Sequence, residues 1–466
     1  MLENKHIRKI HCIGVGGIGV GGVAELLHCK GYQVSGSDCS RNNMTDRLKK
    51  MGITIFEGHA PEQIREVDLV VYSSAITEDN SEIQAARELG IPVIKRAQML
   101  SELMQNDKSI TVSGTHGKTT TTALIAHLLM QANEDPSFMI GGYMNGHPSP
   151  SQFGEGQYFV VEADESDASF LFLSSNISIV TNIDADHLET YEGSFSKLEK
   201  TFVNFLNKLP DDGLAILGVD DSTVVRVSQS LTSRVATYGE AADADYRLLN
   251  YEQEGLRGYF SVKRPRGLPD LRVVLNLPGR HNALNALSVI ALADELKIED
   301  EILLAALAGF PGTKRRFNIH GEISFEKGKV LLVDDYGHHP SEIKVTLEAA
   351  KHAFPGHRIV LAYQPHRYTR TRDLMSAFTE ALSEAHVLLL LGVYSAGEKP
   401  IEGADSYALC HAIKNHGKCS PILIPELTEL PAIINEVVEE GDILILQGAG
   451  SIGGMVYKLL NAHALT

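Results

Sequence analysis

Strand-like apolar runs alternate with stretches of helical period along almost the whole of this 466-residue chain, and few folds can accommodate that alternation. Runs such as KIHCIGVGG, ITVSG and DILILQGAG end in glycine or polar loops, and helical stretches such as GVAELLHCKG follow them. Strands that alternate with helices form parallel sheets flanked by helices. The pattern therefore predicts an α/β fold with ligand sites in the loops at the carboxyl ends of its strands.

The chain is longer than a single hydrophobic core can support, so more than one domain is expected. We predict boundaries at the polar patch QNDKS (105–109) and at GFPGTKRRF (309–317), which glycine and proline mark. Three α/β domains follow: 1–105, Rossmann-like; 106–312, P-loop ATPase-like with a mostly parallel sheet; and 313–466, Rossmann-like.

Charge and hydropathy exclude several classes of protein. The formal charge of −17 opposes non-specific binding to nucleic acids and anionic membranes. No run approaches the roughly 18 apolar residues that cross a bilayer, and the N-terminus lacks a secretory leader pattern. The five cysteines show no C-x-x-C pair or disulfide-framework spacing, so reduced thiols are expected. We predict a cytoplasmic protein, monomeric or weakly dimeric, that binds neither nucleic acid nor membrane.

Residues 110–123, ITVSGTHGKTTTTA, resemble a phosphate-binding loop between a strand and a helix. Gly114 lies only three residues before the Gly-Lys-Thr triplet, so the loop is two residues shorter than G-x-x-x-x-G-K-[ST]. We predict Lys118 against the β- and γ-phosphates and the Thr119 hydroxyl on Mg²⁺. The threonines up to Thr122 are poor helix formers, so their hydroxyls and amides are predicted to face the anion. A glycine turn with a threonine cap is the alternative.

Two acidic clusters follow apolar runs further along the chain. They comprise Glu162, Asp164, Glu165 and Asp167 in VVEADESD, and Asn182, Asp184, Asp186 and His187 in IVTNIDADHLETY. Carboxylates at strand ends hold Mg²⁺ in nucleotide sites, and Glu162 comes first after its apolar run. A solvated acidic turn explains either cluster taken alone, but two clusters beside a phosphate loop favour a metal site.

A second glycine loop, GVGGIG, follows the first strand-like run. Gly14, Gly16 and Gly19 match G-x-G-x-x-G, and Asp38 follows about 20 residues later, as in the dinucleotide fingerprint. The same turn with a ribose-binding acid can hold any nucleotide diphosphate, so the match by itself does not identify NAD.

Six strings together resemble the Mur ligases over nearly the whole chain: GTHGKTTTTA, EADESDASF, NIDADHLETY, PGRHNALNAL, DDYGHHPSE and YQPHRYTRT. The short G-x-x-G-K-T loop is shared by that family, and YQPHRYTRT is most specific for members that use L-alanine. The resemblance implies ATP- and Mg²⁺-dependent amide ligation in bacterial cell-wall synthesis. The lactyl carboxylate of UDP-N-acetylmuramate would attack the γ-phosphate of ATP, and the amine of L-alanine would displace phosphate from the acyl phosphate.

The resemblance also implies roles for individual residues, with the UDP-sugar on the first domain, ATP on the central domain and the amino acid brought by the third. The UDP-sugar residues would be Gly14, Val15, Gly16, Gly17, Ile18, Gly19, Asp38, His59 and Ser73. The ATP residues would be Gly114, Thr115, His116, Gly117, Lys118, Thr119, Thr120, His281, Asn282, Asn285, Arg316, Asp335 and Tyr336. Thr119, Glu162 and His187 would hold Mg²⁺, and Lys118, Arg367, Arg370 and His338 would be catalytic.

Other interpretations remain open for several residues. His187 could serve only as a hydrogen-bonding residue, because Mg²⁺ prefers oxygen ligands, and the two asparagines could cap a helix. Lys200 aligns roughly with a lysine that several relatives carbamylate. The glycine loop GAGSIGG is interpreted as a tight strand-to-helix turn.

Three alternative functions differ from the main prediction. The first is a murein-tripeptide recycling ligase of the same family. The second, of a different class, is an NAD-dependent oxidoreductase, and the third is a P-loop ATPase that acts as a switch or motor.

Overall fold

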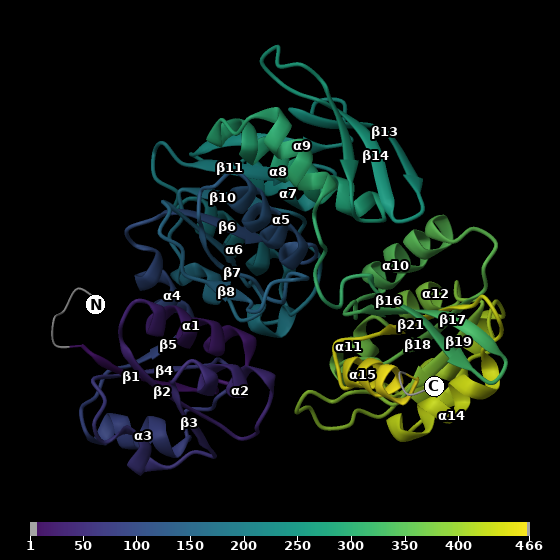
Figure 1. Ribbon diagram of the computed structural model, residues 1–466, viewed down its shortest axis with the longest axis horizontal. Helices are drawn as coiled ribbons and strands as arrows, with labels where there is room; N and C mark the ends of the chain where they lie inside the picture. Colours follow the sequence, from purple (N-terminus) through teal and green to yellow (C-terminus); the bar gives the residue numbers. More distant parts are fainter. Residues whose placement is uncertain (1–6, 464–466) are drawn as a thin grey trace. The chain divides into compact units, whose positions relative to one another are not determined.

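The computed structural model describes residues 7–463, which form three sheets flanked by helices (Figure 1). The contacts divide the chain into two compact units. The first holds the residues up to Leu249, Ser261–Val273 and Leu284–Pro311, and the second holds Asn250–Phe260, Val274–Ala283 and the residues from Gly312 onward. The outer ends of the predicted first and third domains, 1–6 and 464–466, lie outside the described residues. Among residues 7–463, no helix has the length and apolar character needed to cross a bilayer.

The first sheet is parallel, with the strand order β3-β2-β1-β4-β5. Its strands are β1 (Lys9–Ile13), β2 (Gln33–Asp38), β3 (Thr54–Glu57), β4 (Leu69–Tyr72) and β5 (Val93–Lys95). Its helices are α1 (Ile18–Cys29), α2 (Asn43–Lys50), α3 (Ser81–Glu88) and α4 (Arg96–Met104), with a 3₁₀ turn η1 (Pro61–Ile64). The strand order reverses at β1, so the glycine loop after β1 lies at the position where such sheets bind ligands.

The second sheet has ten strands in the order β15-β14-β13-β12-β11-β10-β6-β9-β7-β8. They are β6 (Lys108–Ser113), β7 (Ser137–Met139), β8 (Ser151–Gln152), β9 (Tyr158–Glu162), β10 (Ile177–Val180), β11 (Leu214–Gly218), β12 (Arg234–Gly239), β13 (Tyr246–Glu254), β14 (Arg257–Lys263) and β15 (Leu271–Leu275). Strand β6 pairs in parallel with β9 and β10. The loops that follow these three strands therefore meet at one edge of the sheet.

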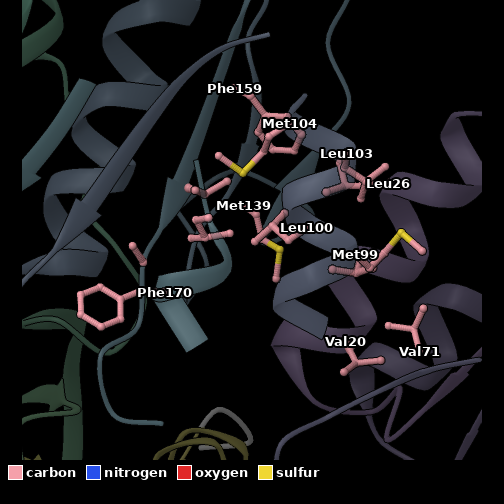
Figure 2. Packing of buried hydrophobic residues seen from close by; sticks show 14 of the residues in the cluster. Val20, Leu26, Val71, Met99, Leu100, Leu103, Met104, Met139, Phe159 and Phe170 are labelled. Atoms are coloured by element: carbon pink, nitrogen blue, oxygen red, sulfur yellow. The ribbon is translucent and has the colours of Figure 1, made fainter. Parts of the chain in front are cut away.

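Helices and 3₁₀ turns connect these strands. They are α5 (Lys118–Gln131), α6 (Phe195–Leu206), α7 (Ser222–Ser228), α8 (Arg280–Leu296), α9 (Asp300–Ala308), η2 (Ser169–Phe172) and η3 (Leu188–Tyr191). One buried cluster joins the helices of the first sheet to the strands of the second (Figure 2). Leu26 on α1 and Leu100 and Leu103 on α4 belong to it, together with Met139 on β7 and Phe159 on β9. The two sheets of the first unit therefore share a core.

The third sheet has the order β16-β17-β21-β18-β19-β20, and only β16 is antiparallel to its neighbour. Its strands are β16 (Asn318–Phe325), β17 (Gly328–Asp335), β18 (Ile359–Tyr363), β19 (Val387–Leu391), β20 (Ile422–Ile424) and β21 (Ile443–Gln447). Its helices are α10 (Pro340–Ala353), α11 (Tyr368–Asp373), α12 (Met375–Leu382), α13 (Ser406–His416), α14 (Leu430–Val437) and α15 (Ile452–His463), with the 3₁₀ turn η4 (Leu427–Glu429).

Successive residues of each central strand in this sheet contribute to different cores. Leu361 packs in the cluster that includes Phe378 of α12, whereas Val360 packs in the cluster that includes Leu430 of α14. Side chains alternate between the faces of a sheet, so an unbroken apolar run supplies both cores. This explains why strands such as VLLLL carry no polar residue.

Candidate active site

The short glycine loop joins β6 to α5, as predicted for a phosphate cradle. Gly114 (φ 119°) and Gly117 (φ 85°) adopt backbone angles that favour glycine. A Cβ on Gly117 would lie 2.7 Å from Oδ1 of Asn285, so the loop also needs glycine for space. The amide of His116 donates to Oδ1 of Asn182 at 2.8 Å, which ties the loop to the end of β10. Helix α5 begins at Lys118, so its first amides open onto the loop.

The side chain of Lys118 folds back over its own loop. Its Nζ donates to the carbonyl of Gly114 at 2.7 Å and to both carboxylate oxygens of Glu165 at 2.9 Å. Lys118 and Glu165 are 13% and 4% exposed, so the pair is shielded from water. Lys118 must exchange Glu165 for another anion before it can neutralise a phosphate.

The acidic surroundings alter the pKa values of this pair. Burial alone would lower the pKa of Lys118, but the carboxylates of Glu165, Asp164 and Glu162 outweigh it and raise the pKa above its ordinary value. Burial raises the pKa of Glu165 to about 7, although Lys118 opposes the shift. The lysine therefore stays charged, and Glu165 has the more labile proton of the two.

The expectation for the four threonines is only partly supported. All four are buried, and the hydroxyl of Thr122 donates to the carbonyl of Lys118 at 2.8 Å instead of facing an anion. A threonine inside a helix readily forms this bond to the carbonyl four residues earlier. The prediction that the hydroxyls up to Thr122 face the anion is therefore wrong for Thr122. Thr119 and Thr120 lie in the first turn of the helix, directly after the loop.

Glu162 and Thr119 converge on one glycine pair. Oε2 of Glu162 accepts from the amide of Gly141 at 2.9 Å. A Cβ on Gly141 would lie 2.5 Å from Oε2 of Glu162, and a Cβ on Gly142 would lie 3.2 Å from Cγ2 of Thr119, so both side chains lie against this glycine pair. A carboxylate and a hydroxyl are oxygen donors that suit Mg²⁺, and these two residues fit that ion.

His187 lies in the loop after β10 with a left-handed backbone (φ 54°). Its Nε2 is 3.6 Å from a carboxylate oxygen of Asp186. This contact is compatible with either interpretation of His187, as a metal ligand or as a hydrogen-bonding residue. Lys200 is exposed on α6.

The first-sheet glycine loop is held by the acid that the fingerprint predicts. The amide of Gly16 donates to Oδ2 of Asp38 at 2.8 Å, and a Cβ on Gly14 would lie 3.2 Å from Cβ of Ser73. Val15 is fully buried, so its side chain packs in the core and only its backbone belongs to the loop surface. Gly17 is the N-cap of α1, and Ile18 and Gly19 are its first two residues.

Arg96, the first residue of α4, belongs to none of the sequence motifs. A Cβ on Gly19 would lie 2.9 Å from Cδ of Arg96, which places this arginine beside the glycine loop. Burial would raise the pKa of Asp164, but Lys118, the hydrogen bonds from Ser166 and, more weakly, Arg96 lower it overall. Arg96 therefore carries positive charge between the glycine loop of the first sheet and the acidic cluster of the second. No motif surrounds Arg96, and only its helix places it there.

Apart from His59, Thr115 and Asn285, which lie in the first unit, the remaining predicted residues belong to the second unit. Asp335 is buried, and its two oxygens accept from the amides of Phe317 and Gly337 at 2.8 and 2.7 Å. Burial raises the pKa of Asp335, while Arg316 opposes the shift. These bonds hold the turn after β17, so Asp335 has a structural role in addition to the predicted role in binding ATP.

The guanidinium groups of two arginines lie over the aromatic ring of Tyr336 in this turn. Arg315 and Arg316 lie 5.0 and 5.2 Å from the ring centroid. His338 follows, with its amide bonded to Oε2 of Glu342 at 2.8 Å. The structure brings the predicted Arg316, Tyr336 and His338 together within the second unit.

The two arginines of YQPHRYTRT occupy different environments. Arg370 is buried, and its Nη1 lies 3.2 Å from Nδ1 of His366. Arg367 begins the turn into α11 with φ 70° and lies 3.9 Å from a carboxylate oxygen of Glu398. A positive φ outside glycine is strained and often marks a functional site. The GAGSIGG loop is a strand-to-helix turn between β21 and α15, as predicted.

His281 lies at the start of α8, where Asn282 bonds the carbonyl of Pro278 at 2.7 Å. The imidazole packs against Gly279, where a Cβ would lie 2.7 Å from its Nδ1. Burial first, and then Arg316, lower the pKa of His281 from 6.5 to about 4, although Glu342 opposes the shift. His281 is therefore neutral at physiological pH.

This shift predicts a loss of stability in acid. A depressed pKa contributes stability above the unfolded value of 6.5, and that contribution is lost as pH falls towards about 4. In His281→Gln the contribution is absent, so the difference in unfolding free energy between wild type and variant should shrink by about 3 kcal/mol between pH 7 and pH 4. Urea unfolding across this range measures it. The exposed His352→Gln is the control and should track the wild type; a constant difference for His281→Gln would contradict the assignment.

Family models match the chain in three consecutive segments. Residues 9–108 match "Mur ligase family, catalytic domain", residues 112–293 match "Mur ligase middle domain", and residues 315–450 match "Mur ligase, glutamate ligase domain". A UDP-N-acetylmuramate–L-alanine ligase of Coxiella burnetii is 47% identical over 462 residues, covering 99% of this chain and 99% of that protein. The chain belongs to the Mur ligase family.

Solved structures confirm the three-domain α/β fold. The UDP-N-acetylmuramate–alanine ligase MurC of Thermotoga maritima has a TM-score of 0.84 and 31% identity, covering 98% of this chain and 99% of that one. A murein peptide ligase of Psychrobacter arcticus has a TM-score of 0.72 and 24% identity over 98% of this chain and 99% of that one, which supports the fold alone. Membership of the Mur ligase family argues against the NAD-dependent oxidoreductase and the switch or motor ATPase.

Proposed function

We propose that this protein ligates L-alanine to the lactyl carboxylate of UDP-N-acetylmuramate at the expense of ATP, through an acyl phosphate, in peptidoglycan precursor synthesis. The full-length similarity to the Coxiella burnetii ligase supports this proposal most directly. The charged lysine at the start of α5, next to the acidic ends of β9 and β10, supports the use of ATP. A carboxylate reacts poorly with an amine until one of its oxygens becomes a good leaving group, so the energy of ATP is needed.

Residues of the second sheet would stabilise the phosphate during transfer. The amides at the start of α5 would bind phosphate oxygens, and Lys118 would leave Glu165 to neutralise the charge that develops on the γ-phosphate. Thr119 and Glu162, with His187 as a further candidate, would hold Mg²⁺. When bound, the ion would offset the repulsion between two anionic reactants. Glu165, whose pKa is raised to about 7, would then be free to exchange a proton.

The other two domains would position the substrates. In the proposed arrangement the domain limits are 1–105, 106–312 and 313–466, and the Gly14–Gly19 loop with Asp38 binds the diphosphate of the UDP-sugar. Arg96 adds a positive charge there. Arg367 and Arg370 would hold a carboxylate or phosphate, and His338 would lie near the reacting groups. A cytoplasmic location and a monomeric or weakly dimeric state stay predictions.

A phosphate-release assay with omitted substrates tests the proposal. Purified protein with ATP, Mg²⁺, UDP-N-acetylmuramate and L-alanine should release phosphate and form the alanyl product in equal amounts. Omission of either the UDP-sugar or L-alanine should abolish product formation. Release of phosphate that does not depend on both substrates would contradict the proposed ligation.

The murein-tripeptide ligase is the second candidate, because the Psychrobacter arcticus enzyme shares the fold. The string YQPHRYTRT, which forms the end of β18 and most of α11, favours L-alanine. The same assay with the free tripeptide in place of L-alanine, and with UDP-N-acetylmuramate kept as the sugar, separates the two. Turnover with the tripeptide at a rate equal to or above that with L-alanine would favour the recycling reaction.

A further inference from the structure

The buried carboxylate of Glu82 has three hydrogen-bonding partners in the domain of the first sheet. Glu82 on α3 is fully buried, and it accepts from the Ser37 hydroxyl at 2.6 Å. Nε2 of His11 lies 3.1 Å from its Oε1, and Nδ1 of His59 lies 2.8 Å from its Oε2. Burial would raise the pKa of Glu82, but the hydrogen bonds from His11 and Ser37 outweigh it and lower the pKa below its ordinary value. Glu82 is therefore ionised.

The ionised carboxylate determines the tautomer of His59. A carboxylate only accepts hydrogen bonds, so Nδ1 of His59 carries the hydrogen that Glu82 accepts. In the tautomer with its hydrogen on Nδ1, Nε2 is left as an acceptor, and it lies 3.4 Å from Sγ of Cys39. Cys39 as nucleophile, His59 as base and the Glu82 carboxylate that orients the base are thus connected by successive contacts. This is the arrangement that activates a thiol or hydroxyl in nucleophilic catalysis.

The other four cysteines have no comparable environment in residues 7–463. Burial raises the pKa of Cys12 to about 12, and burial is also the main cause of the raised pKa of Cys29 and Cys419. Cys410 is buried. Cys39 is exposed at the end of β2, so an external reagent can reach it.

Cys39 also lies in a turn that holds the glycine loop. Asp38, directly before it, accepts from the amide of Gly16 at 2.8 Å. Asn42, three residues after it, donates to the carbonyl of Gly16 at 3.2 Å. A group attached to Cys39 would therefore lie on the same turn as the two residues that bind Gly16.

We propose that Cys39, with His59 as its base and Glu82 as the positioning residue, is a modification site for low-molecular-weight disulfides and soft electrophiles. We further propose that modification of Cys39 and binding of the UDP-sugar at the Gly14–Gly19 loop exclude one another. This second statement rests on the proposed function, whereas the first does not.

The exchange with a disulfide is balanced without another reactant. The thiol proton of Cys39 passes to Nε2 of His59 as its sulfur bonds to one sulfur of the disulfide. The disulfide bond breaks, and the departing thiolate takes the proton from His59. The net reaction is one disulfide exchanged for another, with no change in oxidation state.

Competitive alkylation of the folded full chain tests the site. Iodoacetamide at pH 7, followed by peptide mass spectrometry, should modify Cys39 at least about tenfold faster than the exposed Cys29 of the same molecule. His59→Gln should lower the Cys39 rate about tenfold and leave the Cys29 rate unchanged. Equal rates for the two cysteines, or a Cys39 rate unaffected by His59→Gln, would overturn the proposal. Continued protection of the buried Cys12 and Cys410 in the same experiment verifies that the variant is folded.

The role of Glu82 requires a measurement that a packing effect would not change. The ¹⁵N signals of the His59 ring should show hydrogen on Nδ1 in the wild type and a mixture of tautomers in Glu82→Gln. If Glu82→Gln does not fold, the wild-type spectrum still decides, because hydrogen on Nε2 would contradict the proposed base.

Oxidised glutathione tests the consequence for function. It should add one glutathionyl group at Cys39 and reduce ligation, and dithiothreitol should restore it. Cys39→Ser should keep its ligase activity and resist the reagent, whereas Cys29→Ser should remain sensitive. Modification that leaves ligation unchanged would overturn the second statement.

Protection by substrate separates this inference from the proposed function. Saturating UDP-N-acetylmuramate, with binding verified by calorimetry, should slow alkylation of Cys39 at least tenfold. Binding without protection would overturn mutual exclusion but not the reactivity of Cys39. Absence of binding would refute the proposed function, and the alkylation ratio of Cys39 to Cys29 would still test the site.

Discussion

Lys118→Ala is expected to lower turnover by about 1000-fold, because it removes the positive charge that the loop presents to the transferred phosphate. Affinity for UDP-N-acetylmuramate should change little, since the proposed UDP-sugar loop follows β1 of the first sheet, whereas Lys118 follows β6 of the second. Steady-state phosphate release and calorimetry with the UDP-sugar measure the two effects separately.

The matched control is Lys108→Ala, which removes the same charge from the amino end of the same strand. Lys108 is exposed, and its Nζ lies over the ring of Tyr158 at 5.9 Å from the centroid. This variant should retain wild-type turnover. An equal loss of UDP-sugar binding in Lys118→Ala would show that the two sites have been assigned to the wrong domains.

Glu162→Gln is expected to lower turnover roughly 100-fold at millimolar Mg²⁺, and to raise the Mg²⁺ concentration needed for half-maximal rate. The amide can replace the hydrogen bond to Gly141 through its oxygen, so the fold should persist. What it removes is a negative charge beside Thr119 and Lys118. A titration of turnover against Mg²⁺ measures the change.

Glu155→Gln serves as the control for this charge change, because Glu155 is an exposed residue of the loop before β9. Its Mg²⁺ titration should superimpose on that of the wild type. If Glu162→Gln shows the same half-maximal Mg²⁺ concentration as the wild type, Glu162 does not hold the metal, and the acidic cluster requires another explanation.

The phosphate loop could be predicted because its signals are local. A β-branched run, two glycines and Lys118 in sequence specify strand, turn and helix start, and the structure places β6 and α5 there. The meeting of this loop with Glu162 was also predictable, because the carboxyl ends of parallel neighbouring strands share one edge. Thr122 was predicted wrongly because the pattern does not specify which way a side chain turns within a helix.

Contacts between distant segments could not be read from the pattern. Glu165 bonds Lys118 from 47 residues away, and Glu82 reaches His11 from 71 residues away. Arg96 carries no motif, yet the start of α4 places it beside Gly19.

The sequence by itself determined the family, the α/β class and the positions of the glycine loops, because hydrophobic period and motif spacing act over a few residues. The tertiary structure decided which groups meet: Lys118 with Glu165, Arg96 with the glycine loop, and Cys39 with His59 and Glu82. Such pairs depend on how packed strands and helices direct their side chains in three dimensions, and spacing along the chain does not record that direction.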